Sequence, residues 1–244
     1  MARSIELAFD VLEAIASSKR PLSQGQICTQ LGVAKSSLSG TMKFLRERGY
    51  VQAVTDGGLQ IGSRVLDLSH AYLAEQNLAK IGSEILVEVV DGIRESATLA
   101  ILDDDRALVV AQKSCRQPLA YTMMIGTRPH LHASASGKIL LAFSPIRDVL
   151  LSNLSLEKVA SQTLQDAEKL RDDLDNVIRL GFAVSDNEAL DGVLAIAVPV
   201  NVNGEIIAAL SVAGPDFRLG RTRRETVVDE LKKSAKKIAV AVGG

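Results

Sequence analysis

Aromatic residues are scarce in this sequence of 244 residues, which has no tryptophan, five phenylalanines and three tyrosines. The hydrophobic core must therefore be aliphatic, in a chain that is 47% hydrophobic and 23% charged, as is typical of globular proteins. Long apolar runs are also missing, and no stretch approaches the roughly 18 residues that a membrane span requires. We therefore expect no transmembrane segment and no membrane partner.

Cysteine is nearly absent too, since the chain has only Cys28 and Cys115, far apart in the sequence. The two cysteines give neither a disulfide framework nor a metal-site spacing, which favours a reducing compartment. The N-terminus lacks the uninterrupted apolar stretch of a signal peptide, because Glu6, Asp10 and Glu13 break it. We expect a cytoplasmic protein.

Neither sign of charge is in excess, and the formal net charge is −1. The first 62 residues carry seven lysines and arginines against five acidic residues, and the remainder carries 21 against 24. The N-terminal part is thus slightly basic and the rest slightly acidic. This asymmetry is too small to indicate a nucleic-acid partner by itself.

The N-terminal quarter of the chain has the pattern of a winged helix-turn-helix. Apolar residues recur at spacings of three and four near residues 4–18, 23–31 and 36–48, which predicts three short helices. Gly32 is a helix terminator that allows a tight turn between the second and third helices. Two β-prone runs then flank TDGG at residues 55–58, which is a strong hairpin signal and predicts the wing.

The third of these helices, which we expect to read DNA, has an apolar inner face and a small, polar outer face. Leu38, Met42 and Leu45 mark the inner face. Small residues permit close approach to the groove, and lysine and arginine side chains are available for phosphates or guanine edges. The predicted DNA-binding residues are Ser23, Lys35, Ser36, Ser37, Ser39, Gly40, Lys43 and Arg46.

Two observations weaken this interpretation of the helix. Glu47 also lies on the outer face and would repel phosphate, so we expect it to lie beyond the contact zone. A solvated helix in a small bundle would show the same periodicity as a recognition helix. The hairpin that follows favours the winged helix-turn-helix.

The remainder of the chain predicts a helical linker followed by an α+β domain. Residues 63–92 are helical, with a break near Asn77, and their composition is not that of a flexible linker. Farther on, strand-like runs alternate with helices, including a third strand at 118–126 and a hairpin turn at Asn203-Gly204. We expect an antiparallel sheet flanked by helices. The predicted domains are 1–62 for DNA binding, 63–80 for the linker helix and 81–244 for the C-terminal domain.

The segment RPHLHASASGK, residues 128–138, brings together residue types that could support catalysis. In a hydrolase, Ser134 or Ser136 would be the nucleophile and His130 or His132 its base. Such a base needs a third group to orient it, usually a carboxylate, and the segment contains none. A Ser-x-x-Lys signature fails by one position, and no G-x-S-x-G elbow is present.

Two other interpretations of this segment remain. His130 and His132 could supply two metal ligands, but a third ligand would have to come from a distant residue. Alternatively, Ser134 or Ser136 caps a helix at GKILLAF, and the unpaired amides of its first turn bind an anion. A small carboxylate would then bind without being chemically changed. Serines that only cap the helix, with no ligand, are the alternative, and the resemblance of the surrounding sequence to a known family favours ligand binding.

Several blocks of this sequence resemble the IclR family of bacterial transcription regulators, and together they cover nearly the whole chain. The blocks are residues 4–52, LHASASGKILLAF, LGFAVSDNEALDGVLAIAVPV and AALSVAGP. The resemblance implies a winged helix-turn-helix, a linker helix and a GAF-like effector domain. It also implies homodimers, or dimers of dimers, that bind palindromic double-stranded operators under the control of small organic acids.

The resemblance further implies an effector pocket, and we add His130 to the positions that match the family. The predicted effector-binding residues are Tyr121, Pro129, His130, Ala135, Ser136, Ser185, Asp186, Val193, Ala195, Ser211 and Ala213. Val193, Ala195 and Ala213 make this pocket less polar than a two- or three-carbon acid needs. We therefore expect an aromatic or similarly bulky acid, with Tyr121 available to stack on a ring and His130 available to hydrogen-bond or pair with a carboxylate.

One departure from the family concerns the recognition helix. Family members commonly carry a bulky basic residue where this chain has Gly40, so Ser39 or Lys43 is expected to carry more of the base readout. The sequence predicts an effector-controlled DNA-binding protein, with repression as the expected direction, no metal and no cofactor. The alternative is a hydrolase that uses the segment of residues 128–138.

Overall fold

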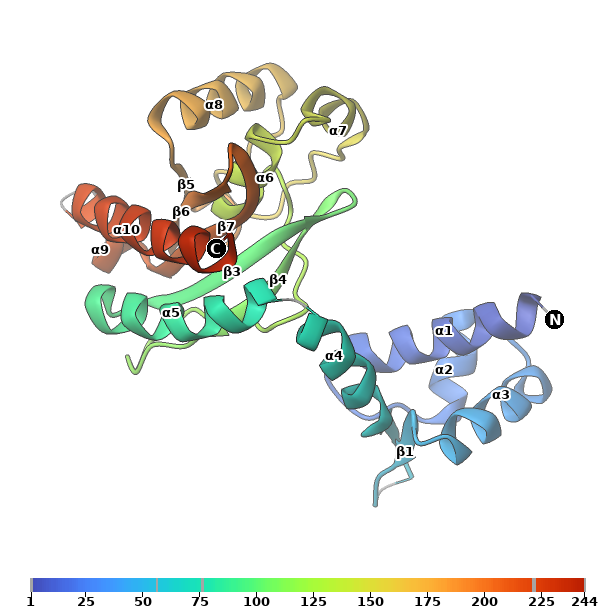
Figure 1. The fold of residues 1–244 in the computed structure, drawn as a ribbon. Helices are drawn as coiled ribbons and strands as arrows, with labels where there is room; N and C mark the ends of the chain where they lie inside the picture. The colour runs from blue at the N-terminus through green and yellow to red at the C-terminus, as the bar shows by residue number, and fades with distance from the viewer. Residues whose placement is uncertain (1, 56, 76, 221–222, 244) are drawn as a thin grey trace. The chain divides into compact units, whose positions relative to one another are not determined.

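The computed structural model describes residues 2–55, 57–75, 77–220 and 223–243 (Figure 1). The chain divides into two compact units, Met1–Glu75 and Gln76–Gly244, each with its own hydrophobic core. The predicted linker at 63–80 comprises α4 (Arg64–Glu75) and the start of α5 (Asn77–Ile93), so it contributes to both units. Within the described ranges, no helix is long and apolar enough to span a membrane.

The first unit is the predicted winged helix-turn-helix. Its elements are α1 (Ala2–Ser17), α2 (Gln24–Leu31), α3 (Lys35–Glu47), β1 (Val51–Ala53), β2 (Leu59–Ile61) and α4. Strands β1 and β2 pair antiparallel, and Leu22 bridges to Leu59, which ties the wing to the chain before α2. The predicted inner face of α3 is confirmed, because Leu38, Met42 and Leu45 are buried in the core of this unit.

The two ends of α2 explain the tight turn before α3. At its start, Ser23 Oγ accepts from the Gln26 amide at 3.2 Å, and Gln26 Oε1 accepts from the Ser23 amide at 2.8 Å. This reciprocal pair is a capping box. At its end, Gly32 has a φ of 64°, the left-handed conformation that glycine adopts without steric cost. These caps fix where α2 ends and α3 begins.

The second unit is built on a five-stranded antiparallel sheet in the order β4-β3-β7-β6-β5. Asn203 and Gly204, with φ of 53° and 91°, form the predicted turn between the last two strands. The elements are α5, β3 (Ser96–Asp103), β4 (Arg106–Lys113), α6 (Ala135–Ala142), α7 (Arg147–Asn153), α8 (Ala167–Leu180), β5 (Ala183–Asp186), β6 (Val193–Val202), β7 (Glu205–Pro215), α9 (Asp216–Leu219) and α10 (Arg224–Gly243).

The two faces of this sheet carry side chains of different size. Along β7, the small Ala209, Ser211 and Ala213 alternate with the larger Leu210 and Val212. The larger side chains face α5 and α10, and the smaller ones face α6, on which α8 packs (Figure 1). Because its neighbours on the sheet are small, α6 lies close to the strands and every one of its residues is buried.

The prediction of a third strand at residues 118–126 is wrong. The segment is a loop, joined to β4 where the Gly126 amide donates to the Val109 carbonyl at 2.8 Å. Pro118 has no amide hydrogen to donate to a sheet. The short helix α9 was not predicted from the sequence.

Candidate functional sites

The predicted DNA-binding residues are all exposed on the first unit. Seven of them lie on α3, and the eighth, Ser23, lies before α2, where its hydroxyl is engaged in the capping box. Gly40 lies on the exposed side of α3, and a Cβ atom there would have no atom within 4 Å apart from its chain neighbours and the backbone of its own helix. The exposed face of α3 is thus open to a partner and unusually flat at Gly40.

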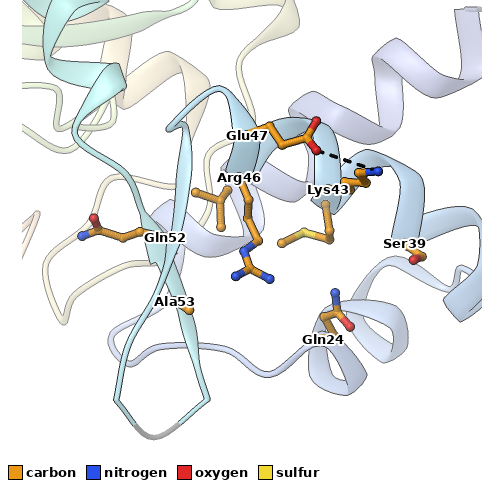
Figure 2. Close-up of a pocket in the computed structure, with 9 residues that line it drawn as sticks. Gln24, Ser39, Lys43, Arg46, Glu47, Gln52 and Ala53 are labelled. Atoms are coloured by element: carbon orange, nitrogen blue, oxygen red, sulfur yellow. Dashed lines mark ion pairs between the residues drawn. The ribbon is translucent and has the colours of Figure 1, made fainter.

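An open cleft of about 560 Å³ runs along one side of α3 and is lined by the wing strand and the start of α2. Its lining residues are Gln24, Ser39, Met42, Lys43, Arg46, Glu47, Val51, Gln52 and Ala53. Figure 2 shows Arg46 directed into the space between β1 and α2, with Gln24 and Ala53 on either side. Of the predicted DNA-binding residues, this cleft includes Ser39, Lys43 and Arg46.

The two cations of this cleft differ in their partners. Lys43 Nζ lies 3.9 Å from Glu47 Oε1, an exposed pair one helical turn apart, and Figure 2 shows the two side chains turned toward each other. Such a pair contributes little to stability but reduces the positive charge that Lys43 offers. In the described part of the chain, Arg46 forms no ion pair. Glu47 lines the same cleft as Lys43 and Arg46.

Replacing Glu47 with glutamine is expected to strengthen binding to duplex DNA about threefold at low salt, because it removes a charge that repels phosphate and releases Lys43. Fluorescence anisotropy with a labelled duplex measures the change. Glu13→Gln is the matched control, since Glu13 is an exposed acid on α1 that does not line the cleft. An equal gain in both variants would contradict a local effect.

A cavity of about 170 Å³ lies in the second unit between the start of α6, the sheet and the loop after β4. Nine of the eleven predicted effector-binding residues line it: Tyr121, Pro129, His130, Ala135, Ser136, Ser185, Val193, Ala195 and Ser211. Met123, Thr127, Ser134 and Ala189 also line it and were not predicted as effector-binding. The cavity is smaller than the ~300–1,000 Å³ typical of drug-sized ligands, so it suits a small metabolite.

Two predicted pocket residues, Asp186 and Ala213, do not line this cavity. Asp186 ends β5 and is exposed, and its carboxylate accepts from the Asn187 side chain at 2.8 Å. Ala213 pairs with Ala195 and Ser96 in the sheet and shares a face with Ser211, but its methyl group does not reach the cavity. No acidic side chain belongs to the described lining of the cavity.

The start of α6 offers backbone hydrogen-bond donors beside the cavity. Ser134 is the N-cap, and its hydroxyl accepts from the Gly137 amide at 3.0 Å and donates to the His130 carbonyl at 2.8 Å. Among the hydrogen bonds of the described residues, none takes up the amides of Ala135 and Ser136, both of which line the cavity. These donors and the helix dipole favour an anion at this position.

Gly137 is needed for close packing at the start of α6. A Cβ atom at this position would lie 2.5 Å from the His130 carbonyl oxygen and 2.6 Å from Leu131 Cα. Only glycine therefore allows the backbone at residues 130–131 to pack against the first turn of α6. That contact positions His130 at the cavity wall.

Neither histidine of the segment is placed to activate a serine. His130 Nδ1 lies 2.9 Å from Arg106 Nη1, and His132 Nε2 lies 3.0 Å from the Glu157 carbonyl. Throughout the described chain, no hydrogen bond joins either imidazole to the hydroxyl of Ser134 or Ser136. The geometry therefore gives the hydrolase interpretation no support. Likewise, no group of three metal-ligating side chains forms in the described residues.

His132 is buried, and burial lowers its pKa from the usual value of 6.5, while its contact with the Glu157 carbonyl has the opposite effect. The unfolded histidine therefore binds a proton more readily than the folded one. Neutral His132 therefore adds to the free energy of unfolding. This contribution is fully present above about pH 6.5 and is lost as the pH falls below that value. We expect His132→Gln to reduce the loss of stability in acid, measured by urea unfolding between about pH 5 and 8. An unchanged pH profile would contradict this expectation.

The largest charged side chain in the core is Lys138, which is only 1% exposed. Its Nζ lies 2.6 Å from Glu188 Oε2 and 2.8 Å from Asp173 Oδ2, and it donates to the Val184 carbonyl at 3.0 Å. Burial raises the pKa of Glu188, and the Lys138 ammonium opposes that rise. In the sequence, Lys138 stands out only in a Ser-x-x-Lys signature that fails by one position, and nothing there indicates its burial.

The cluster of Lys138, Asp173 and Glu188 joins three elements of the second unit, two of which contribute residues to the cavity. Lys138 belongs to α6, Asp173 to α8 and Glu188 to the loop between β5 and β6. The same loop carries Ala189 to the cavity wall, and its Glu188 carbonyl accepts from Thr163 Oγ1 at 2.7 Å. The cluster therefore holds the loop between β5 and β6, which forms one wall of the cavity, in place against α6.

Comparison with known proteins finds a matching family model for each of the two units. Residues 4–54 match the model of the IclR helix-turn-helix domain, and residues 70–240 match the model described as bacterial transcriptional regulator IclR C-terminal. The probable transcriptional regulator SauR of Cupriavidus necator is 30% identical over 93% of this chain and 92% of its own length. The transcriptional repressor IclR of Escherichia coli is 27% identical, over 99% of this chain and 90% of its own.

Solved structures share the fold. An IclR homologue from Microbacterium hydrocarbonoxydans, solved in complex with 4-hydroxybenzoate, superposes with a TM-score of 0.86 at 24% identity and covers 98% of both chains. The two family models together match most of the sequence, on both sides of the division between the units. The chain therefore belongs to the IclR family of bacterial transcriptional regulators.

Proposed function

We propose that this regulator binds operator DNA through α3 and the wing, and that a small, partly apolar organic acid in the cavity at the start of α6 modulates that binding. The observation that carries the proposal is the cavity itself. It combines free backbone donors with apolar walls and has no acidic side chain among the described residues that line it. An acid fits such a site better than a cation or a neutral sugar.

The proposed DNA contacts are the exposed residues of α3 together with Ser23. Arg46 and Lys43 would neutralise phosphates, while Ser36, Ser39 and the bare surface at Gly40 would face the major groove. The first unit also exposes the large apolar side chains of Phe9 and Leu66. This exposure supports a homodimer, or dimer of dimers, on a palindromic operator, which light scattering in solution tests.

An aromatic acid is the proposed class of effector. Met123, Val193 and Ala195 supply apolar contacts around a ring. Burial raises the pKa of Tyr121, which keeps its hydroxyl protonated and able to donate a hydrogen bond. The Microbacterium relative binds an aromatic acid, 4-hydroxybenzoate, at 24% identity to this chain. This compound is therefore the first probe to test.

We propose that the protein represses transcription. We also propose that it is located in the cytoplasm, because its DNA partner lies there. The Escherichia coli relative is named a repressor. We propose a binding function without catalysis, because Ser134 serves as a helix cap and the histidines contact other partners.

Replacing Ala195 with leucine is expected to fill part of the cavity and weaken binding of 4-hydroxybenzoate at least tenfold. Leucine adds three carbon atoms to a side chain that lines an empty space, so the cost in stability is small. Isothermal titration calorimetry measures the binding, and thermal unfolding verifies the fold.

The same variant tests regulation. A ligand shifts the DNA-binding equilibrium only by its difference in affinity for the two states. We therefore expect 4-hydroxybenzoate to change the affinity of the wild-type protein for DNA upstream of its own gene and to leave that of Ala195→Leu unchanged. Equal responses in the two proteins would count against this cavity as the effector site.

A further inference from the structure

We infer that Arg106 is a positioning residue for effector recognition, which holds His130 as a hydrogen-bond donor and thereby selects a ligand with a carboxylate. The inference rests on the proposed function, because it concerns the ligand of the same cavity. Arg106 is the first residue of β4 and does not line the cavity itself. Its effect on the ligand is transmitted through His130, which lines the cavity.

The contact between the two side chains determines which imidazole nitrogen carries the proton. Arg106 Nη1 lies 2.9 Å from His130 Nδ1. A guanidinium group remains protonated in proteins and has no acceptor, so Arg106 donates this hydrogen bond and Nδ1 accepts it. A neutral imidazole whose Nδ1 accepts carries its proton on Nε2. His130 is therefore held as an Nε2–H donor.

A second contact restricts the orientation of the same ring. The His132 ring packs edge-on against it, with centroids 5.5 Å apart and an angle of 70° between the planes. His132 is held in turn by the Glu157 carbonyl, 3.0 Å from Nε2. The His130 ring is thus held by the His132 ring on one side and by the Arg106 guanidinium on another. These two contacts pre-organise the ring for a ligand.

The charge of Arg106 has no acidic partner in the described residues. The nearby Asp103, which pairs with Arg106 across the hairpin of β3 and β4, instead forms an ion pair with Arg128. Charged side chains that are withdrawn from water are usually paired with an opposite charge, and Arg106 is partly withdrawn. Since the described cavity lining also lacks acidic side chains, a bound carboxylate would supply the missing negative charge.

These observations separate acids from their neutral analogues. A carboxylate accepts from His130 Nε2–H and gains from the Arg106 charge behind the ring, whereas a carboxamide gains only the hydrogen bond. We expect wild-type protein to bind 4-hydroxybenzoate at least tenfold more tightly than 4-hydroxybenzamide. Arg106→Met should weaken binding of the acid about tenfold and change binding of the amide little.

Arg128→Met is the matched control. It removes the same charge from the same neighbourhood, but Arg128 is paired with Asp103 and does not line the cavity. We expect it to keep the preference for the acid. Equal losses in Arg106→Met and Arg128→Met, or no preference for the acid in the wild-type protein, would overturn the inference.

A nitrogen NMR measurement on the ligand-free full chain tests the positioning without any ligand. The chain has three histidines, so His130→Gln and His132→Gln assign the imidazole signals. We expect His130 to show an unprotonated Nδ1 and a protonated Nε2, and Arg106→Met to shift it toward a mixture of tautomers. A protonated Nδ1 in the wild-type protein, or an unchanged spectrum in Arg106→Met, would overturn the inference. If the wild-type protein binds neither probe, the proposed effector class fails, and this spectrum alone decides the role of Arg106.

Discussion

Lys138→Met is expected to destabilise the second unit by about 3–5 kcal/mol, because it leaves the buried Glu188 carboxylate without its cation. Lys138 is 1% exposed and is the shared partner of Glu188 and Asp173. Methionine keeps much of the volume of the side chain, so the loss reports the charge and not a cavity. Urea unfolding followed by circular dichroism measures the change.

Two further variants show whether the loss has this cause. Lys237→Met breaks an ion pair with Glu88 in which both side chains are well exposed, and it should cost less than about 1 kcal/mol. Adding Glu188→Gln to Lys138→Met removes the uncompensated charge and should recover part of the stability. Equal costs for the two lysines, or no recovery in the double variant, would contradict a buried charge cluster.

Arg46→Ala is expected to weaken binding to non-specific duplex DNA at least tenfold and to reduce the salt dependence by about one phosphate contact per bound chain. Arg46 points into the cleft between the wing and α2 and forms no ion pair with another described residue (Figure 2). Its charge is therefore fully available to a phosphate. Lys43→Ala should cost less, because Glu47 already offsets part of the charge of Lys43. Anisotropy titrations at several salt concentrations measure both effects.

Arg48→Ala serves as the control for the loss of one positive charge. Arg48 follows α3, its guanidinium lies 4.9 Å from the centre of the Phe44 ring, and it does not line the cleft. We expect its affinity for DNA to stay within about threefold of the wild type. A loss as large as that of Arg46→Ala would mean that net charge, and not the cleft, governs binding.

Local sequence signals predicted those parts of the fold that depend on neighbouring residues. Gly32 ends α2 because a residue without a Cβ adopts the left-handed conformation of a helix end wherever the helix lies. The Asn203-Gly204 turn follows from the positive φ that these residues tolerate. The positions around Ser136 came from the family resemblance, and the structure brings most of them together around one cavity.

The features that the sequence did not predict depend on contacts between distant residues. Lys138 and Glu188 are 50 residues apart, and their pairing requires the loop after β5 to lie beside α6. Arg106 and His130 are 24 residues apart and meet because a hairpin and a long loop bring them together. The wrong strand at residues 118–126 was predicted from local composition alone. A β-prone composition does not by itself supply the neighbouring strands with which a strand must pair.

A crystal structure of the full chain grown with 4-hydroxybenzoate tests whether a small organic acid binds in the cavity at the start of α6. We expect a carboxylate within about 2.7–3.2 Å of the Ala135 or Ser136 amide or of His130 Nε2. An acid found elsewhere on the protein, with this cavity closed by side chains, would contradict it.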